Sequence, residues 1–281
     1  MSTQIHPTAF VETGAQLGEG VIIGPYCIVG PHVKLANNVK LRSHVVIQGE
    51  TTIGENTEIY SFAVIGEPPQ VVNFKDKPSR VEIGSNNVIR EHVTIHAGKS
   101  VNGSYTKIGN NCYLMVATHI AHDCELGNNV IMANNATIAG HVKIGDFVII
   151  GGLSAIHQFV RIGEHAFIGG TAGVSEDVIP YGAVMARKAR MGGLNLTGLR
   201  RRGFSREEIF KLRDAYNMLV NDDTATLQER LRKIEENYAD YPAVQRLISF
   251  IKEDPHRPLC LPSEAWDLHT SEENGNNGRN G

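Results

Sequence analysis

The sequence predicts a mainly β protein, a parallel β-helix followed by a smaller α-helical domain. Three observations predict this architecture: a strict six-residue apolar period, Asn and Gly residues between the apolar positions, and a change to helical spacing after about Tyr181. The first two indicate short strands joined by tight turns, and the third indicates helices that cover one end of the β-helix.

Apolar residues recur at every sixth position along most of the chain. The positions from Ile5 to Ile65 keep this spacing without exception, and a later run keeps it from Ile108 to Val174. An α-helix with about 3.6 residues per turn would scatter such positions around its axis. A short strand followed by a tight turn explains them.

The fifth position of each hexad is small or β-branched. Cys112 and Cys124 occupy this position, so both are expected to be buried small side chains rather than reactive thiols.

Asn pairs at residues 37–38, 110–111 and 134–135 suit the turns, because Asn and Gly tolerate a left-handed backbone conformation. Successive coils would stack through parallel hydrogen bonds about 4.8 Å apart. The pattern resembles the hexapeptide-repeat β-helix. The resemblance implies a left-handed triangular prism with three hexads, eighteen residues, in each coil. The period alone does not choose the hand.

The β-helix is predicted to occupy residues 1–190, with two polar segments that break the rhythm. These segments, residues 66–80 and 97–107, are expected to be loops that project from the prism, and such loops often carry binding residues.

Residues 191–260 are predicted to form a helical C-terminal domain. Capping boxes at Ser205–Glu208 and Thr226–Glu229 precede apolar residues at helical spacing, and a third helix is expected after Pro242. Residues 261–281 are low in hydrophobic residues and are expected to be disordered.

The composition excludes several classes of protein. A net charge of −3 does not suggest nucleic-acid binding. No apolar run approaches the roughly 18 residues that span a bilayer, and the N-terminus does not resemble a signal peptide. The four cysteines have no paired spacing, so a cytoplasmic protein with reduced thiols is expected.

Histidines gather on one edge of the predicted prism. With eighteen residues per coil, four of the five histidines after Ile108 share an edge: His119, His122, His141 and His157. His141 lies above Asp123, and Gly140 lies above His122. Histidine titrates near neutral pH and suits proton transfer, so this edge is predicted to be functional. Asp123 could orient the imidazole, but only if a corner turns the two adjacent side chains toward each other.

A solvated surface position is the preferred interpretation for four other histidines: His6, His32, His44 and His165. Two glycine pairs, residues 151–152 and 169–170, also stack in register. They are either turn glycines or a strip without side chains, along which an acyl chain could lie.

Four motifs carry a resemblance to one family. They are THIAHDC (residues 118–124), ANNATIAGH (133–141), AIHQF (155–159) and GLRRRGFS (198–205). Together they resemble the UDP-N-acetylglucosamine O-acyltransferases of lipid A biosynthesis, from the start of the chain to about residue 255.

The resemblance implies transfer of a 3-hydroxyacyl group from acyl carrier protein, as its phosphopantetheine thioester, to the 3-position of a UDP-linked amino sugar. His122 would be the general base, Asp123 its support, and the Gly140 N–H the oxyanion donor, without a covalent intermediate, a metal or a further cofactor. A homotrimer with the site between subunits is implied.

The resemblance also assigns residues that bind substrate or carrier protein: Gln70, His119, His141, His157, Gln158, Asn195, Arg201 and Arg202. Gly170 occupies the position that sets acyl length, and a glycine there implies a long chain. Nine basic residues against two acidic ones between Arg187 and Arg213 fit an acidic carrier protein.

One departure from the family concerns the acceptor. After Gln70 the family commonly has Asp-Leu-Lys, whereas this chain has Val71-Val72-Asn73, and Lys188 stands where the family often has His. We therefore hypothesise that a 3-amino analogue of the sugar is preferred, which would give an amide.

Three alternatives remain. Clustered histidines also suit a zinc hydratase of the carbonic anhydrase type, although that family has two histidines five residues apart and His119 and His122 are three apart. The related N-acyltransferase of the same pathway carries an extra N-terminal domain, for which a repeat that begins at Ile5 leaves no room. A structural β-helix without activity would explain the repeat but not the histidine edge.

Overall fold

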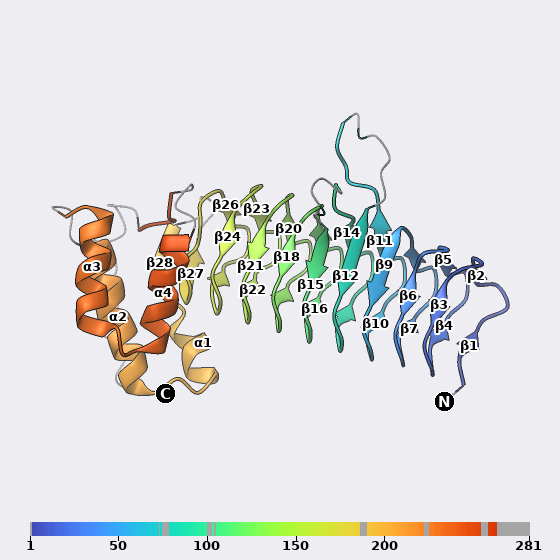
Figure 1. Ribbon diagram of the computed structural model, residues 1–281, viewed down its shortest axis with the longest axis horizontal. Coiled ribbons are helices and arrows are strands. Elements are labelled where there is room, and N and C mark those ends of the chain that lie inside the picture. Colours follow the sequence, from blue (N-terminus) through green and yellow to red (C-terminus); the bar gives the residue numbers. More distant parts are fainter. Residues whose placement is uncertain are drawn as a thin grey trace, which may run out of the picture.

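The computed structural model describes residues 2–72, 74, 79–99, 103, 105–185, 190–221, 225–253 and 258–262. It is a long prism of stacked coils with helices at its C-terminal end (Figure 1). From β1 (Gln4–Ile5) to β23 (Ala155–Ile156), each strand pairs in parallel with the strand three further along the chain, so each of these coils contributes one strand to each of three sheets. At the end β25 (Phe167–Ile168) pairs with β27 (Gly182–Met185), and β27 pairs antiparallel with β28 (Arg190–Leu194).

We name the three sheets A, B and C. Sheet A contains β1 (Gln4–Ile5), β4 (Ile22–Ile23), β7 (Lys40–Leu41), β10 (Glu58–Ile59), β13 (Val88–Ile89), β16 (Tyr113–Leu114), β19 (Ile131–Met132), β22 (Ile149–Ile150), β25 (Phe167–Ile168), β27 (Gly182–Met185) and β28 (Arg190–Leu194). Sheet B contains β2 (Phe10–Val11), β5 (Ile28–Val29), β8 (Val46–Ile47), β11 (Val64–Glu67), β14 (Thr94–His96), β17 (His119–Ile120), β20 (Thr137–Ile138), β23 (Ala155–Ile156) and β26 (Gly173–Val174). Sheet C contains β3 (Gln16–Leu17), β6 (Lys34–Leu35), β9 (Glu50–Ile53), β12 (Arg80–Ile83), β15 (Thr106–Ile108), β18 (Glu125–Leu126), β21 (Lys143–Ile144) and β24 (Arg161–Ile162).

The register confirms the coil length and places the two interruptions. Stacked corner residues such as Asn38 and Asn56 are 18 positions apart. The separation grows to 30 between Asn56 and Asn86, and to 25 between Thr94 and His119, because a coil there carries an insertion. The first insertion begins later than predicted, since β11 continues to Glu67 through its pairing with β14.

The first residue of each hexad fills the interior of the prism. Ile23, Ile59 and Ile89 are at most 1% exposed, and each such side chain contributes roughly 1.5–3 kcal/mol by leaving water. Cys112 and Cys124 are buried as predicted, and burial raises the pKa of the Cys112 thiol to about 11 and of the Cys124 thiol to about 12. Neither thiol is therefore a nucleophile near neutral pH.

The corners adopt the left-handed conformation. Asn38, Asn111 and Asn135, the second members of the predicted pairs, have φ of 58°, 57° and 59°. We call the three lines of corners the A–B, B–C and C–A edges, after the sheets that each edge joins in chain order.

Four helices form the C-terminal domain: α1 (Leu196–Arg201), α2 (Arg206–Val220), α3 (Leu227–Tyr238) and α4 (Pro242–Glu253). Both predicted capping boxes form, at the start of α2 and of α3. α1 was not predicted as a separate helix, because a six-residue helix has too short an apolar pattern. No helix among the described residues has the length and apolarity that crossing a membrane requires.

The helical domain is attached to the last coils by charged and aromatic contacts. Arg161 Nε lies 2.7 Å from Asp177 Oδ2, and the Arg161 guanidinium lies over the Phe250 ring of α4. Arg246 of α4 pairs with Glu164 at 2.9 Å. Residues 263–281, which include most of the predicted disordered tail, lie outside the described residues.

Candidate active site

His122 and Asp123 form a hydrogen-bonded pair at the B–C edge, between β17 and β18. Asp123 has a φ of 60°, so the chain turns a corner between the two residues and their side chains converge. His122 Nδ1 lies 2.8 Å from Asp123 Oδ2. The sequence did not decide whether a corner lies between His122 and Asp123. The structure has that corner, and the two side chains are in contact.

The pair is buried and further connected. The side chains of His122 and Asp123 are 9% and 2% exposed, and His141 Nε2 lies 3.5 Å from the same Asp123 Oδ2. The Lys99 N–H donates to Asp123 Oδ1 at 3.0 Å. Because a carboxylate only accepts hydrogen bonds, the His122 proton is held on Nδ1 and the Nε2 lone pair is left to accept another proton.

Gly140 lies against the His122 ring, as the eighteen-residue register predicts. The His141 N–H donates to the His122 carbonyl at 3.0 Å, which stacks the two corners. A Cβ on Gly140 would lie 2.3 Å from His122 Cε1, so a larger residue would displace the imidazole. Among the hydrogen bonds of the described residues, the Gly140 N–H has no acceptor, and it is available to a bound group.

His141 continues the B–C edge. Its ring stacks on Phe159 at 4.7 Å between centroids and meets the His122 ring edge-on at 5.1 Å. Burial lowers the pKa of His141, although the Asp123 carboxylate acts in the opposite direction. His141 is therefore favoured as a neutral hydrogen-bonding group near neutral pH.

The neighbouring strands of sheet B bring in a histidine that the sequence reasoning missed. His96, at the end of β14, is 8% exposed, and its ring meets His119 edge-on at 5.3 Å. His119 Nδ1 lies 2.7 Å from Thr94 Oγ1. Burial lowers the pKa of both imidazoles. Counting by eighteen fails across the second insertion, which hid His96, whereas pairing the apolar positions Ile95 and Ile120 would have found it.

The other predicted site residues lie at several different places on the prism. His157 is exposed on the B–C edge, with Nδ1 3.1 Å from the Gln158 carbonyl, and Gln158 lies one coil above Gly140. Gln70 is exposed just after β11. Asn73 and Lys188, at which the chain departs from the family, lie outside the described residues, as does Arg187 of the basic cluster.

Asn195 and Arg202 lie at the C–A edge, away from His122. Asn195 Oδ1 accepts the Gly198 N–H and caps α1, and its Nδ2 donates to the His165 carbonyl at 3.0 Å. Arg202 donates to the Phe147 carbonyl at 2.9 Å, and Arg201 is exposed. Within one chain these side chains are not brought to the His122–Asp123 pair.

Gly170 lies on the third edge, A–B, where it is exposed. The nearest atom to a Cβ built on it is the Gly152 carbonyl oxygen, at 3.2 Å. Of the stacked glycine pairs, Gly170 is exposed and Gly152 is half-buried, whereas Gly169 is buried and a Cβ on Gly151 would lie 2.4 Å from Gly170 N. These glycines and the histidine pair are on different edges of the prism.

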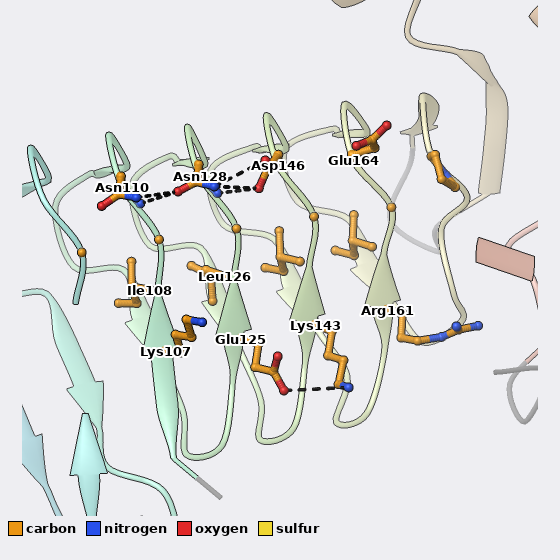
Figure 2. A pocket seen from close by; sticks show the side chains of 18 of the residues that line it. Lys107, Ile108, Asn110, Glu125, Leu126, Asn128, Lys143, Asp146, Arg161 and Glu164 are labelled. Atoms are coloured by element: carbon orange, nitrogen blue, oxygen red, sulfur yellow. Dashed lines mark hydrogen bonds and ion pairs between the residues drawn. The ribbon is translucent and has the colours of Figure 1, made fainter. Parts of the chain in front are cut away.

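A separate groove of about 920 Å³ lies on sheet C, beside α4. Figure 2 shows its column of charged side chains, which includes Lys107, Glu125, Lys143 and Arg161. None of the site histidines lines this groove, so it is distinct from the candidate active site.

His122, Asp123 and His141 also bear on the zinc alternative, because their ligand atoms lie within 4.8 Å of one another. Two ligands at about 2.0–2.1 Å from a tetrahedral zinc ion are roughly 3.3 Å apart. The 2.8 Å separation of His122 Nδ1 and Asp123 Oδ2 is shorter and fits a hydrogen bond. The geometry therefore favours a proton-transfer pair over a zinc site.

The fold and this site define a transferase built on hexapeptide repeats. The family described as bacterial transferase hexapeptide (six repeats) matches residues 2–37 and 105–140, and Udp N-acetylglucosamine O-acyltransferase; Domain 2 matches residues 177–260. The chain belongs to the acyl-(acyl-carrier-protein)–UDP-N-acetylglucosamine O-acyltransferases, the enzymes that act in lipid A biosynthesis.

The similarity to individual members is extensive. The enzyme of Caulobacter vibrioides with this name is 50% identical, over 92% of this chain and 98% of its own length. The structure of LpxA from Acinetobacter baumannii has a TM-score of 0.87 and 42% identity, covering 91% of this chain and 99% of that one. The Francisella novicida UDP-N-acetylglucosamine acyltransferase has a TM-score of 0.88 and 36% identity, over 93% and 95% of the two chains. These matches confirm the left-handed β-helix.

Proposed function

We propose that this chain transfers a long 3-hydroxyacyl group from the phosphopantetheine thioester of acyl carrier protein to the 3-hydroxyl of UDP-N-acetylglucosamine, with His122 as general base. The 2.8 Å contact between His122 Nδ1 and Asp123 Oδ2 supports this proposal most directly, because it leaves Nε2 as the basic atom. No metal or further cofactor takes part in the proposed reaction.

In the proposed reaction His122 Nε2 removes the proton from the sugar 3-hydroxyl as its oxygen attacks the thioester carbonyl. The Gly140 N–H donates to the oxyanion of the tetrahedral intermediate. The Asp123 carboxylate stabilises the imidazolium that forms. When the intermediate collapses, the C–S bond breaks, and the leaving sulfur takes the proton from His122. The acyl group never bonds to the enzyme.

We infer that the active form is a homotrimer with sites between subunits. The residues that the family resemblance assigns to one reaction occupy three edges of the prism: His122 the B–C edge, Gly170 the A–B edge, and Asn195 and Arg202 the C–A edge. A second copy whose other edges face the B–C edge would complete the site. The molecular mass in solution tests this assembly.

The basic side chains of the helical domain fit an acidic carrier protein. Arg200 and Arg201 at the end of α1, and Arg206 and Arg213 of α2, are exposed. A positive surface of this kind raises the rate at which an acidic partner arrives. A cytoplasmic location agrees with a carrier-protein substrate and with four buried free cysteines.

Mass spectrometry of the product tests the function. The purified protein is incubated with UDP-N-acetylglucosamine and a series of 3-hydroxyacyl carrier proteins of increasing chain length. A 3-O-acylated sugar nucleotide is expected, and hydrolysis of the thioester without a sugar product would contradict the proposal.

A second acceptor is favoured by one observation. Val71 stands where the family commonly has a charged residue, so the segment after Gln70 offers an apolar side chain in place of a charged one. We propose that the chain prefers a 3-amino analogue of the sugar, whose nitrogen would attack the same thioester and give an amide.

A further inference from the structure

Thr106 lies between the second insertion and the catalytic pair. It is the first residue of β15, and its side chain is fully buried. Its Oγ1 donates to the His96 carbonyl at 2.7 Å and accepts the Asp123 N–H at 2.9 Å. One hydroxyl therefore connects the end of β14 to the corner that carries Asp123.

At other corners of the prism, the N–H of the left-handed residue has a different kind of acceptor. At Asn38, His141 and Phe159 the left-handed residue donates its N–H to a backbone carbonyl one coil earlier, at 2.8 to 3.1 Å. At Asp123 the left-handed residue donates its N–H to a side-chain oxygen, Thr106 Oγ1, at the start of the strand that follows the second insertion.

Packing alone does not require a hydroxyl at this position. In the register of sheet C, Val81 pairs with Thr51 on one side and with Thr106 on the other, so the same inward column accepts valine one coil below Thr106. Valine has nearly the shape of threonine without the hydrogen bond. Packing therefore accepts either residue in this column, and it is the hydroxyl of Thr106 that contacts the Asp123 corner.

Lys99, at the start of the second insertion, also contacts the Asp123 carboxylate. The Lys99 N–H, on the other side of the insertion, donates to Asp123 Oδ1, while Oδ2 faces His122. Asp123 is thus held by its backbone through Thr106 and by its carboxylate through Lys99. Both bonds orient Oδ2 toward the His122 imidazole.

We propose that Thr106 is a positioning residue for the reaction: its hydroxyl holds the Asp123 corner so that the carboxylate keeps His122 Nδ1 protonated and Nε2 aimed at the acceptor. The inference rests on the proposed role of His122. Thr106 is fully buried, so its loss should slow the chemical step and leave substrate binding unchanged.

The test compares kcat and KM of Thr106→Val, Thr106→Ser and the parent chain, with 3-hydroxyacyl carrier protein and the preferred sugar nucleotide. Thr106→Val should lower kcat about 10- to 100-fold with both KM values unchanged, because a small displacement of a catalytic group has effects of this size. Thr106→Ser keeps the hydroxyl and should retain most of the parent kcat. Equal kcat for Thr106→Val and the parent would overturn the inference, as would equal damage in the two variants.

A matched control removes another buried hydroxyl from the same column. Thr51 is fully buried two coils below Thr106, and its Oγ1 donates to the Gln48 carbonyl at 2.6 Å. Thr51→Val should leave kcat unchanged. If it lowers kcat as much as Thr106→Val does, the effect is general destabilisation, and the inference is wrong.

Two further variants cover the remaining outcomes. If Thr106→Val does not assemble, Thr106→Ser and Thr106→Ala decide the question, because they differ only in the hydroxyl, and equal kcat would refute the proposed role. His122→Ala is measured in parallel. Full turnover in His122→Ala would refute the proposed base, whereas an inactive His122→Ala beside a fully active Thr106→Val would refute only the inference on Thr106.

Discussion

His122 and Asp123 are adjacent in the chain, yet their side chains face each other at 2.8 Å, because Asp123 turns a corner of the prism with a φ of 60°. On a straight strand the two side chains would point to opposite faces. The corner converts sequence neighbours into a catalytic pair, and the coil above adds Gly140 and His141 to it.

Replacing His122 by Ala should lower kcat by about 10²- to 10⁴-fold, the usual contribution of a general base. The cause is loss of the Nε2 lone pair that accepts the proton of the acceptor. Steady-state kinetics on protein of confirmed assembly measure the effect. His32→Ala, an exposed histidine lower on the prism, is the control and should behave as the parent chain does. Retained turnover in His122→Ala would remove this residue from the mechanism.

Gly140→Ala should reduce kcat by about 100-fold, because the new Cβ would lie 2.3 Å from His122 Cε1 and push the imidazole away from the acceptor. Gly192→Ala is a suitable control, since the nearest atoms to its Cβ are 3.6 Å away. Comparing kcat of the two variants checks this. An active Gly140→Ala would show that the close approach of Gly140 to His122 is not required.

Gly170→Met should shorten the preferred acyl chain. Gly170 is exposed and the nearest atom to its Cβ is the Gly152 carbonyl oxygen at 3.2 Å, so a methionine can project over the glycine strip after a shift of a few tenths of an ångström in the coil. The measurement is the relative kcat/KM for carrier proteins with acyl chains of increasing length, with Gly192→Met as the control. An unchanged order of preference would separate Gly170 from the selection of chain length.

The acceptor preference should be visible in a direct competition. With equal concentrations of UDP-N-acetylglucosamine and its 3-amino analogue, we expect mostly amide product, because the charged pair typical of the family after Gln70 is absent here. Val71→Asp combined with Asn73→Lys changes both departing positions and should shift the ratio toward the ester. A clear preference of the parent chain for the plain sugar would contradict the hypothesis.

His165 should make folding stability depend on pH. Burial, with the charges of Arg202 and Arg246, lowers its pKa from 6.5 to about 4. The folded protein keeps this ring neutral where the unfolded chain binds a proton, so the stabilisation is complete above about pH 6.5 and is lost as the pH falls toward 4. The loss is on the order of 2–3 kcal/mol.

His165→Phe tests this, because phenylalanine can keep the stack between Phe147 and Tyr181 but does not titrate. Denaturant unfolding at several pH values should show that the difference in unfolding free energy between the parent and the variant changes in that window. A constant difference from about pH 8 to pH 4 would contradict the assignment.

Much of the site could be read from the sequence once the coil length was known. Counting by eighteen placed Gly140 over His122 and His141 over Asp123, and the backbone bond from His141 to His122 agrees. The same counting failed across the insertions, so it missed His96. Solvated surface was expected for His165, but the ring lies under the helical domain and is 9% exposed, because a periodic pattern contains no information on what covers an edge.

The sequence by itself determined the architecture, because a strict six-residue period permits few arrangements other than stacked short strands, and it determined the family through four motifs. Only the tertiary structure decided that Asp123 reaches His122, that the Asp123 N–H donates to the Thr106 hydroxyl, and that Asn195 and Arg202 lie on a different edge from His122. These relationships depend on a single left-handed φ and on contacts between distant segments. Side-chain direction at a corner is set by the backbone around it, which residue types and spacing do not specify.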